Sequence, residues 1–172
     1  MDINSFGNGI SPDTEPDIPQ LVQQASSIVS NIESSWAKKK LFVISGGNEV
    51  QTYANDQWVA RISNHPQAHS KMVKYIAGST EDIDASHTAY EAQYIDTLST
   101  YDIQKILSKS PTSIAYTAKL VYLMPFPLKD RVFHELIVVH KASAEDGEFF
   151  VISIPISPLP SAKLRLELYP NS

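Results

Sequence analysis

The chain has 172 residues, a net charge of −5 and 42% hydrophobic residues, which fits one globular domain and argues against a disordered chain. The acidic balance argues against nucleic-acid binding, and the lack of cysteine excludes disulfides, thiolate catalysis and cysteine-ligated zinc. No apolar run reaches the roughly 18 residues of a membrane helix, and the first residues do not resemble a signal peptide. We therefore expect an intracellular, cytoplasmic protein.

The N-terminal part of the chain changes character near residue 18. Glycine, proline and acidic residues without periodicity predict a flexible arm over 1–18, followed by a single domain over 19–172. That domain opens with apolar residues at spacings of three and four, which predict a helix over 19–39. The lysines at 38–40 end this apolar stripe and suit the negative end of a helix dipole.

Short β-rich runs follow the predicted helix, at 41–45, 49–54 and 57–63. The turn Gly46-Gly47-Asn48 separates the first two, and its glycines tolerate positive φ. These runs predict a meander. In the third run Trp58 and Arg61 fall on opposite faces, so only one of them can face the core.

A broken helical pattern is predicted over 66–107. Gly78 is a plausible helix stop, and Ser79 followed by Asp82 resembles a helix start. Pro111 closes this stretch.

From Ser113 onward, the spacing of the apolar residues changes to a period of two. Long β-rich runs cover 114–124, 132–140 and 149–156, and strict alternation continues over 163–169. A hairpin turn is predicted at 144–147. Helices first and long strands later indicate an α+β fold, in which a curved antiparallel sheet packs against a long helix.

The connection between the first two long strands resembles a junction of START-type lipid-binding domains. In the segment from Tyr122 to Phe133, one strand ends near Pro125. After a short loop, Arg131 and Phe133 begin the next strand. Residues 58–65 resemble the tryptophan–arginine–serine–histidine strand of a fungal START-like family of uncharacterised function.

Other parts of the chain extend this resemblance to about residues 57–156. Glu91 and Tyr94 resemble that family's glutamate–tyrosine pair, and residues 136–139 and 151–155 match its two following strands. The resemblance implies a helix-grip fold, with a cavity for an apolar ligand between helix and sheet. Family members close this cavity with a long C-terminal helix that the sequence up to Ser172 does not show. The helix over 19–39, a partner chain or sequence beyond this chain would have to replace it.

The resemblance also implies a set of ligand-binding residues in which aromatic side chains line a pocket and a few charges anchor the ligand. The predicted residues are Trp58, Arg61, Glu91, Tyr94, Tyr116, Tyr122, Phe126, Arg131 and Phe133. A buried pair of Glu91 with an arginine, Arg61 or Arg131, could hold a ligand hydroxyl or carboxylate. The alternative is an outward-facing Arg61 and an ordinary packed aromatic core, and the sequence leaves both readings open.

Catalytic and metal-binding patterns are lacking. There is no Gly-x-Ser-x-Gly elbow and no phosphate-binding loop. His65 and His69 sit four apart, but Pro66 lies between them and no glutamate completes the motif; His134 and His140 lack a third ligand. We expect no enzyme activity, no metal and no cofactor.

The sequence thus predicts non-enzymatic binding of a lipid or another apolar small molecule. The alternative is a protein-interaction module whose groove or sheet edge, at 163–169, is completed by a partner chain or a dimer mate. The lysines at 38–40 are either a solvated helix end or a contact with anionic lipid headgroups at a membrane surface.

Overall fold

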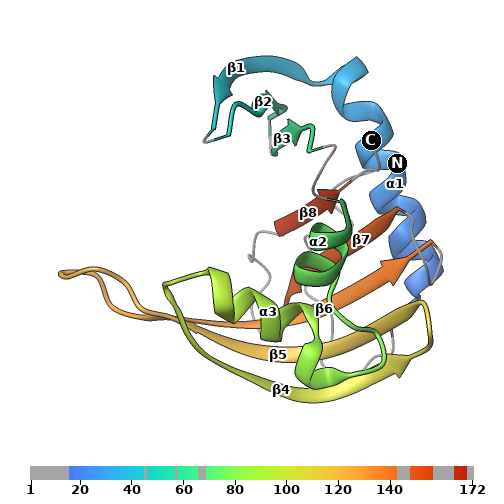
Figure 1. Cartoon of the computed structure of the whole chain (residues 1–172), viewed down its shortest axis with the longest axis vertical. Coiled ribbons are helices and arrows are strands. Elements are labelled where there is room, and N and C mark those ends of the chain that lie inside the picture. The colour runs from blue at the N-terminus through green and yellow to red at the C-terminus, as the bar shows by residue number, and fades with distance from the viewer. Residues whose placement is uncertain are drawn as a thin grey trace.

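The computed structural model describes residues 16–44, 46–56, 58–65, 69–142, 148–156 and 165–169, with the backbone alone for His69 and 165–169. Most of the predicted arm over 1–18, and the whole predicted turn at 144–147, lie outside these residues. The described chain is mixed α+β, with a few helices and two antiparallel sheets (Figure 1). In chain order the elements are α1 (Ile18–Ser35), β1 (Ala37–Val43), β2 (Glu49–Ala54), β3 (Val59–Ser63), α2 (His69–Met72), a π-helical turn (Val73–Ala77), a 3-10 turn (Ile83–Ala85), α3 (His87–Tyr94), β4 (Leu98–Lys109), β5 (Ser113–Tyr122), β6 (Arg131–Lys141), β7 (Phe149–Pro155) and β8 (Arg165–Tyr169).

Helix α1 begins close to the predicted residue but ends earlier. Asp17 caps its start by accepting a hydrogen bond of 3.0 Å from the backbone N–H of Gln20. The backbone of Trp36 is extended, with φ −96° and ψ 149°, so the prediction of a helix to residue 39 is wrong. The lysines at 38–40 belong to β1, where the backbone N–H of Lys40 donates to Thr52 Oγ1 at 2.9 Å. Pairing with a distant strand therefore decides the conformation of this segment.

The small sheet has the order β1-β2-β3 and confirms the predicted meander. Gly46 and Gly47 turn the chain between β1 and β2 with φ values of 93° and 82°, which favour glycine. In β3 the side chains alternate as predicted, with Arg61 on the exposed side and Ile62 on the half-buried side.

The large sheet is an antiparallel meander with the order β4-β5-β6-β7-β8. Strands β5 to β8 fall where the period of two predicts them. The prediction of helix as far as residue 107 is wrong, because Leu98–Lys109 forms β4. The pairing of β4 with β5 shifts register at three places, between Leu98 and Thr100, between Ile103 and Lys105, and between Ile106 and Ser108. Each shift changes which face the next side chain occupies, so the apolar residues of β4 do not alternate.

The helical segment between the sheets is broken, as predicted, but it is shorter than predicted and ends at Tyr94. Gly78, with φ 69°, ends the π-helical turn, and its N–H donates to the carbonyl of Val73 at 3.2 Å. The predicted helix start is a 3-10 turn, which Asp82 caps by accepting from the backbone N–H of Asp84.

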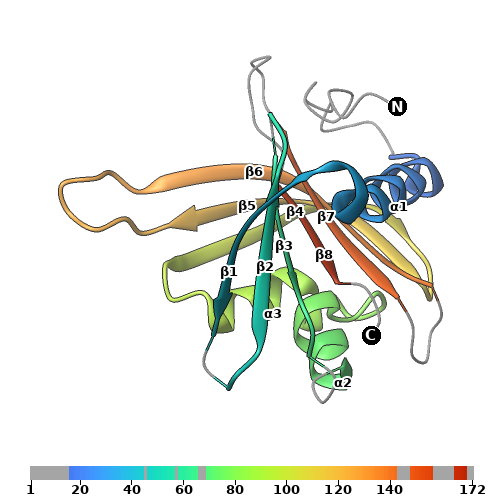
Figure 2. The same ribbon diagram turned by 90° about the horizontal axis from the view of Figure 1, so that it is seen from above.

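The central strands of the large sheet are buried on both faces, and the two faces meet different helices (Figure 2). Side chains of β5, β6 and β7 on one face pack with Ala77 and with half-buried residues of α2 and α3; these strand residues are Ile114, Tyr116, Ala118, Leu120, Ile137, Val139, Phe149 and Val151. Side chains on the opposite face pack with Ala25 of α1; these are Ala115, Leu136, Val138, Phe150, Ile152 and Ile154. Because both faces are covered, these strands read as nearly continuous apolar runs.

Candidate functional site

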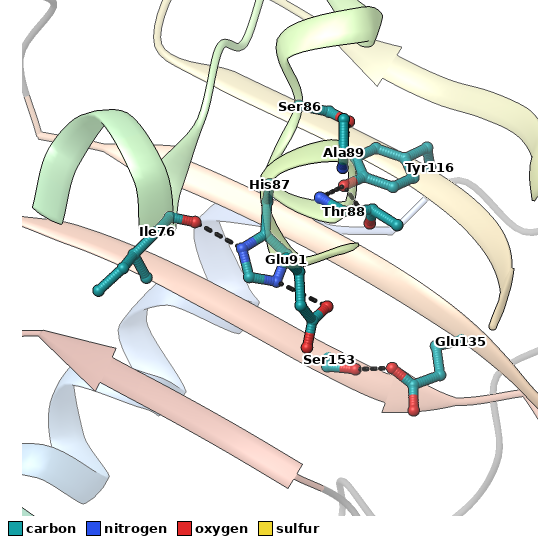
Figure 3. A network of polar contacts seen from close by, with 9 residues as sticks. All are labelled: Ile76, Ser86, His87, Thr88, Ala89, Glu91, Tyr116, Glu135 and Ser153. Carbon is teal, nitrogen blue, oxygen red and sulfur yellow. Dashed lines mark hydrogen bonds and ion pairs between the residues drawn. The ribbon is translucent and has the colours of Figure 1, made fainter. Parts of the chain in front are cut away.

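Helix α3 buries polar side chains that a short helix usually exposes. Ser86 caps the helix, and its Oγ accepts from the backbone N–H of Ala89 at 3.3 Å. The next residues, His87 and Thr88, are buried, and so is Glu91 one turn later, with 6% of its surface exposed. All three lie where α3 packs toward the large sheet (Figure 3). A buried polar side chain is costly unless it finds partners, so the partners define the site.

Thr88 is bound to the centre of the sheet by Tyr116. Tyr116 is fully buried in β5, and its Oη accepts from the backbone N–H of Thr88 at 3.2 Å. The same hydroxyl is 2.8 Å from Thr88 Oγ1 (Figure 3). Burial raises the pKa of Tyr116 to about 12, although its hydrogen bonds to Thr88 act in the opposite direction. The phenol therefore stays protonated at neutral pH and holds α3 against β5.

His87 connects the π-helical turn to Glu91. Its Nδ1 lies 2.5 Å from the carbonyl oxygen of Ile76, which can only accept, so Nδ1 donates. Its Nε2 lies 3.5 Å from Oε2 of Glu91, one helical turn away. The imidazole thus fixes the position of the Glu91 carboxylate relative to the preceding turn.

A second carboxylate lies on the sheet face beneath α3. Ser153 of β7 donates a hydrogen bond from its hydroxyl to Oε2 of Glu135 in β6. Glu135 pairs with Ala118 and Ser153 pairs with Ile137, so both point to the same face as Tyr116. Figure 3 shows Glu91 pointing from α3 toward this face.

We refer to these side chains together as the α3–sheet polar cluster: His87, Thr88, Glu91, Tyr116, Glu135 and Ser153. It lies between α3 and the large sheet, beside the apolar side chains that pack on the same sheet face. Chemically, the cluster offers hydroxyl groups and carboxylates to a polar group placed among apolar surroundings.

Only part of the predicted binding set lies in this cluster. Glu91 and Tyr116 belong to it. Tyr122 and Phe133 lie farther along the same sheet face, where their rings meet edge to face with centroids 5.6 Å apart. Arg131 pairs with Tyr122 in the sheet and is exposed.

The remaining predicted residues lie elsewhere. Trp58 packs against the side of the large sheet that faces α1. Arg61 is on the exposed face of β3, which is the alternative that the sequence left open. The Glu91 carboxylate lies 3.5 Å from Nε2 of His87. Tyr94 is exposed at the end of α3, and Phe126 is 97% exposed in the connection between β5 and β6. The predicted set is therefore not one pocket.

Several members of the cluster escaped the sequence analysis: His87, Thr88, Glu135 and Ser153. Ser86 before a short helical run was a usable cap signal for α3. Glu135 has the same parity as Ile137 and Val139 in an apolar run, which was a signal for a carboxylate on the core-facing side of the strand. The pairing of Ser153 with Glu135 depends on the register of β6 and β7, which the sequence does not show.

A second polar contact lies at the other end of β5 and β6. Ser113 Oγ is 2.6 Å from Nδ1 of His140, and Lys141 Nζ donates to the carbonyl oxygen of Gly78 at 2.7 Å. Burial lowers the pKa of His140 and also that of Lys141. These contacts join β6 to the turn before α3.

His140 predicts a dependence of stability on acidic pH. Since the folded protein binds a proton at His140 less readily than the unfolded chain, stability is complete above the ordinary histidine pKa and falls as the pH decreases below it. We expect urea unfolding at pH 7.5 and pH 5 to show a smaller loss of stability in His140→Gln than in the unchanged protein. Equal losses in both proteins would contradict this role.

Among the residues that the structure describes, no group of three or more histidine, aspartate or glutamate side chains is placed to hold a metal ion. Within the same part of the chain, no helix is both long and apolar enough to cross a membrane.

Comparison with known proteins gives a family but no function. No curated protein and no solved structure matches the sequence. Residues 58–168 match DUF3074, a family described as a protein of unknown function. The match runs from just before β3 into β8 and covers more than half of the chain, including every member of the α3–sheet polar cluster. The chain therefore belongs to the DUF3074 family.

Proposed function

We propose that this protein binds an apolar small molecule of the lipid class, without catalysis, between the α2–α3 segment and the large sheet. The observation that carries the proposal is the α3–sheet polar cluster, whose members are buried or half-buried beside the apolar side chains of the same sheet face. Ligand sites are mostly apolar and contain a few placed polar groups that orient the ligand. Glu91 and Tyr116 are the candidates for orienting a ligand's polar end.

The resemblance to START-like domains supports the same location. Strand β5 ends at Tyr122, a proline-containing connection follows, and Arg131 opens β6, in the order that the resemblance implies. The residues that carry the resemblance, about 57–156, lie almost wholly inside the stretch that matches the family. In this proposal the fold is of the helix-grip type and the ligand lies between helix and sheet.

The chemistry of Tyr116 favours a role in binding over a role in catalysis for this residue. A general base works best when its pKa lies near the pH at which it acts. The Tyr116 hydroxyl, with its pKa raised to about 12, is poorly suited to accept a proton at neutral pH. Its hydrogen bonds to Thr88 suit a positioning role instead.

The competing explanation is that the polar cluster only fastens α3 to the sheet. Ala118 and Ala115 separate the two explanations, because both are fully buried in β5 but face opposite sides. Ala118 faces the α2–α3 side, and Ala115 faces α1. The added volume of leucine would compete with a ligand at Ala118 alone.

We expect Ala118→Leu to abolish ligand retention with little loss of stability, because its side chain takes space that the ligand occupies. Ala115→Leu should keep the ligand and lose about 1–3 kcal/mol of stability, as overpacked cores do. Ligand retention is measured by native mass spectrometry of protein purified without detergent, and stability by urea unfolding. Equal stability losses, together with no adduct on the unchanged protein, would contradict the proposal.

The same spectra identify the ligand class. An adduct of a few hundred daltons on a monomer supports the proposal, and organic extraction followed by mass analysis then identifies what is released. If the unchanged protein carries no adduct, the cluster serves only to hold α3 on the sheet.

A second candidate function is a protein-interaction module. Strand β1 forms an edge of the small sheet and is exposed along its whole length, with Leu41, Phe42 and Val43 among its exposed side chains. An exposed edge strand presents backbone groups with which an added strand can pair. A dimer without a small-molecule adduct in the native spectrum would favour this function.

A further inference from the structure

The connection between β5 and β6 carries apolar side chains far from the helices. It projects beyond the body of the protein in both views (Figures 1 and 2). We call residues 123–130 the hairpin tip. Phe126 is 97% exposed, and Leu123 and Leu128 are also exposed on the same short connection. Single exposed apolar residues are ordinary, but a group of them at the end of a projection indicates a contact surface.

Hydrogen bonds hold the hairpin tip in a defined shape. The backbone N–H of Leu128 donates to the carbonyl of Pro125 at 3.0 Å, and that of Met124 donates to Oδ1 of Asp130 at 3.2 Å. At the base of the tip, the N–H of Leu123 donates to the carbonyl of Thr97 at 2.8 Å. The exposure of Phe126 is thus part of an ordered turn.

The charges beside the hairpin tip differ in sign from the rest of the chain. Lys129 and Arg131 are exposed next to the apolar residues, and Asp130 is the one acidic residue between them. With Arg131 included, two cations and one carboxylate give residues 123–131 a charge of +1, whereas the whole chain carries −5. Segments that bind membrane surfaces likewise combine apolar side chains, which enter the bilayer, with neighbouring cationic side chains.

We propose that the hairpin tip inserts into the interface of an anionic lipid bilayer, with Phe126 and Leu128 among the acyl chains and Lys129 and Arg131 beside the phosphates. A stable protein partner needs about 800 Å² of complementary surface on each side, which a narrow convex turn does not supply. A bilayer needs no complementary shape, because it opens around the inserted side chains. The tip is separate from the α3–sheet polar cluster, so this inference and the proposed ligand binding fail independently.

The absence of cysteine gives a direct test. An environment-sensitive dye is attached to Leu128→Cys and, as the matched control, to Val59→Cys, because Val59 is 73% exposed on β3. Vesicles of phosphatidylcholine with phosphatidylserine should move the dye emission to shorter wavelength at position 128 and leave it unchanged at position 59.

Binding measurements on the full-length, unlabelled protein test the two kinds of contact. Phe126→Ala should lower the vesicle partition coefficient about tenfold, the effect expected for one large apolar side chain, and Val59→Ala should leave it unchanged. Lys129→Gln combined with Arg131→Gln should weaken binding to vesicles that contain phosphatidylserine and have no effect on pure phosphatidylcholine.

Several results would overturn the inference. One is no sedimentation with either kind of vesicle. Another is equal partition of Phe126→Ala and the unchanged protein. A third is an emission change at position 128 that depends on protein concentration without vesicles, which would assign the tip to a second copy of the chain. Because Phe126 is almost wholly exposed, its replacement is not expected to alter the unfolding curve, which serves as the control for folding.

Discussion

Replacing Gly78 with alanine should lower the free energy of unfolding by about 4 kcal/mol, which combines backbone strain with overpacking. The backbone of Gly78 has φ 69° and ψ −164°, a region that is essentially reserved for glycine. An alanine Cβ at this position would lie 2.4 Å from the backbone nitrogen of His87 and 2.5 Å from the carbonyl carbon of Ser86. Both neighbours are backbone atoms, so relief requires the start of α3 to move.

The same replacement should also disturb the α3–sheet polar cluster. Gly78 forms an isolated β-bridge with Ser86, the residue that caps α3. Movement there would displace Thr88, whose bonds to Tyr116 hold the helix on the sheet.

Gly47→Ala is the matched control for Gly78→Ala. Gly47 also has a positive φ, 82°, but an added Cβ would meet nothing within 4 Å. Its replacement should cost only the strain of the backbone conformation, about 1 kcal/mol. Urea unfolding of both variants measures the difference. If Gly78→Ala proves no less stable than Gly47→Ala, the close approach between Gly78 and the start of α3 is wrong.

Local pattern in the sequence was enough for much of the fold. The period of three and four identified α1, and the period of two identified β5 to β8. The glycine pair at 46–47 identified the turn of the small sheet. In each case neighbouring residues carry the information, because burial of one or both faces repeats along the chain.

The errors fall where distant contacts override local pattern. The lysines at 38–40 have good helix propensity, yet they pair with β2 in a strand. The register shifts in β4 remove the alternation that would have marked Ile103 and Ile106 as strand residues. Helix propensity and periodicity are weak predictors wherever a bulge or a remote partner sets the conformation.

The candidate site was predicted only in part, for the same reason. Glu91 and Tyr116 were identified from the resemblance and from aromatic content, but their partners come from other elements. The contact between Thr88 and Tyr116 joins residues far apart in the sequence, and that between Glu135 and Ser153 depends on strand register. Arg61 shows the converse: alternation placed it opposite Trp58, but only the packing of the sheet decided which face is exposed.

Tyr116→Phe should make the protein less stable at neutral pH by about 2 kcal/mol, because the backbone N–H and the hydroxyl of Thr88 lose a buried partner. The aromatic ring remains, so packing in the centre of β5 is retained. The size of this loss alone does not distinguish the hydroxyl's hydrogen bonds from other effects of the substitution, but its dependence on pH does.

The sign of that dependence follows from the raised pKa of Tyr116, about 12 in the folded protein against an ordinary value of 10.0. Between these values the unfolded chain loses the phenol proton more readily than the folded protein, so stability is complete below pH 10 and falls as the pH rises toward 12. Tyr116→Phe has no phenol proton at this position, so its free energy of unfolding does not decrease through this titration. The stability difference between the two proteins should therefore narrow by about 1.4 kcal/mol between pH 9 and pH 11.

Urea unfolding of the two proteins across this pH range measures the narrowing, since effects of the other tyrosines are common to both. The control is Tyr101→Phe, because the ring of Tyr101 is exposed on β4. Its stability should change with pH in the same way as that of the unchanged protein. A constant difference between Tyr116→Phe and the unchanged protein from pH 9 to pH 11 would mean that the Tyr116 hydroxyl is reached by water. In that case the polar cluster would be an open, hydrated cleft beneath α3, and a ligand would enter by displacing water rather than by filling a closed apolar space.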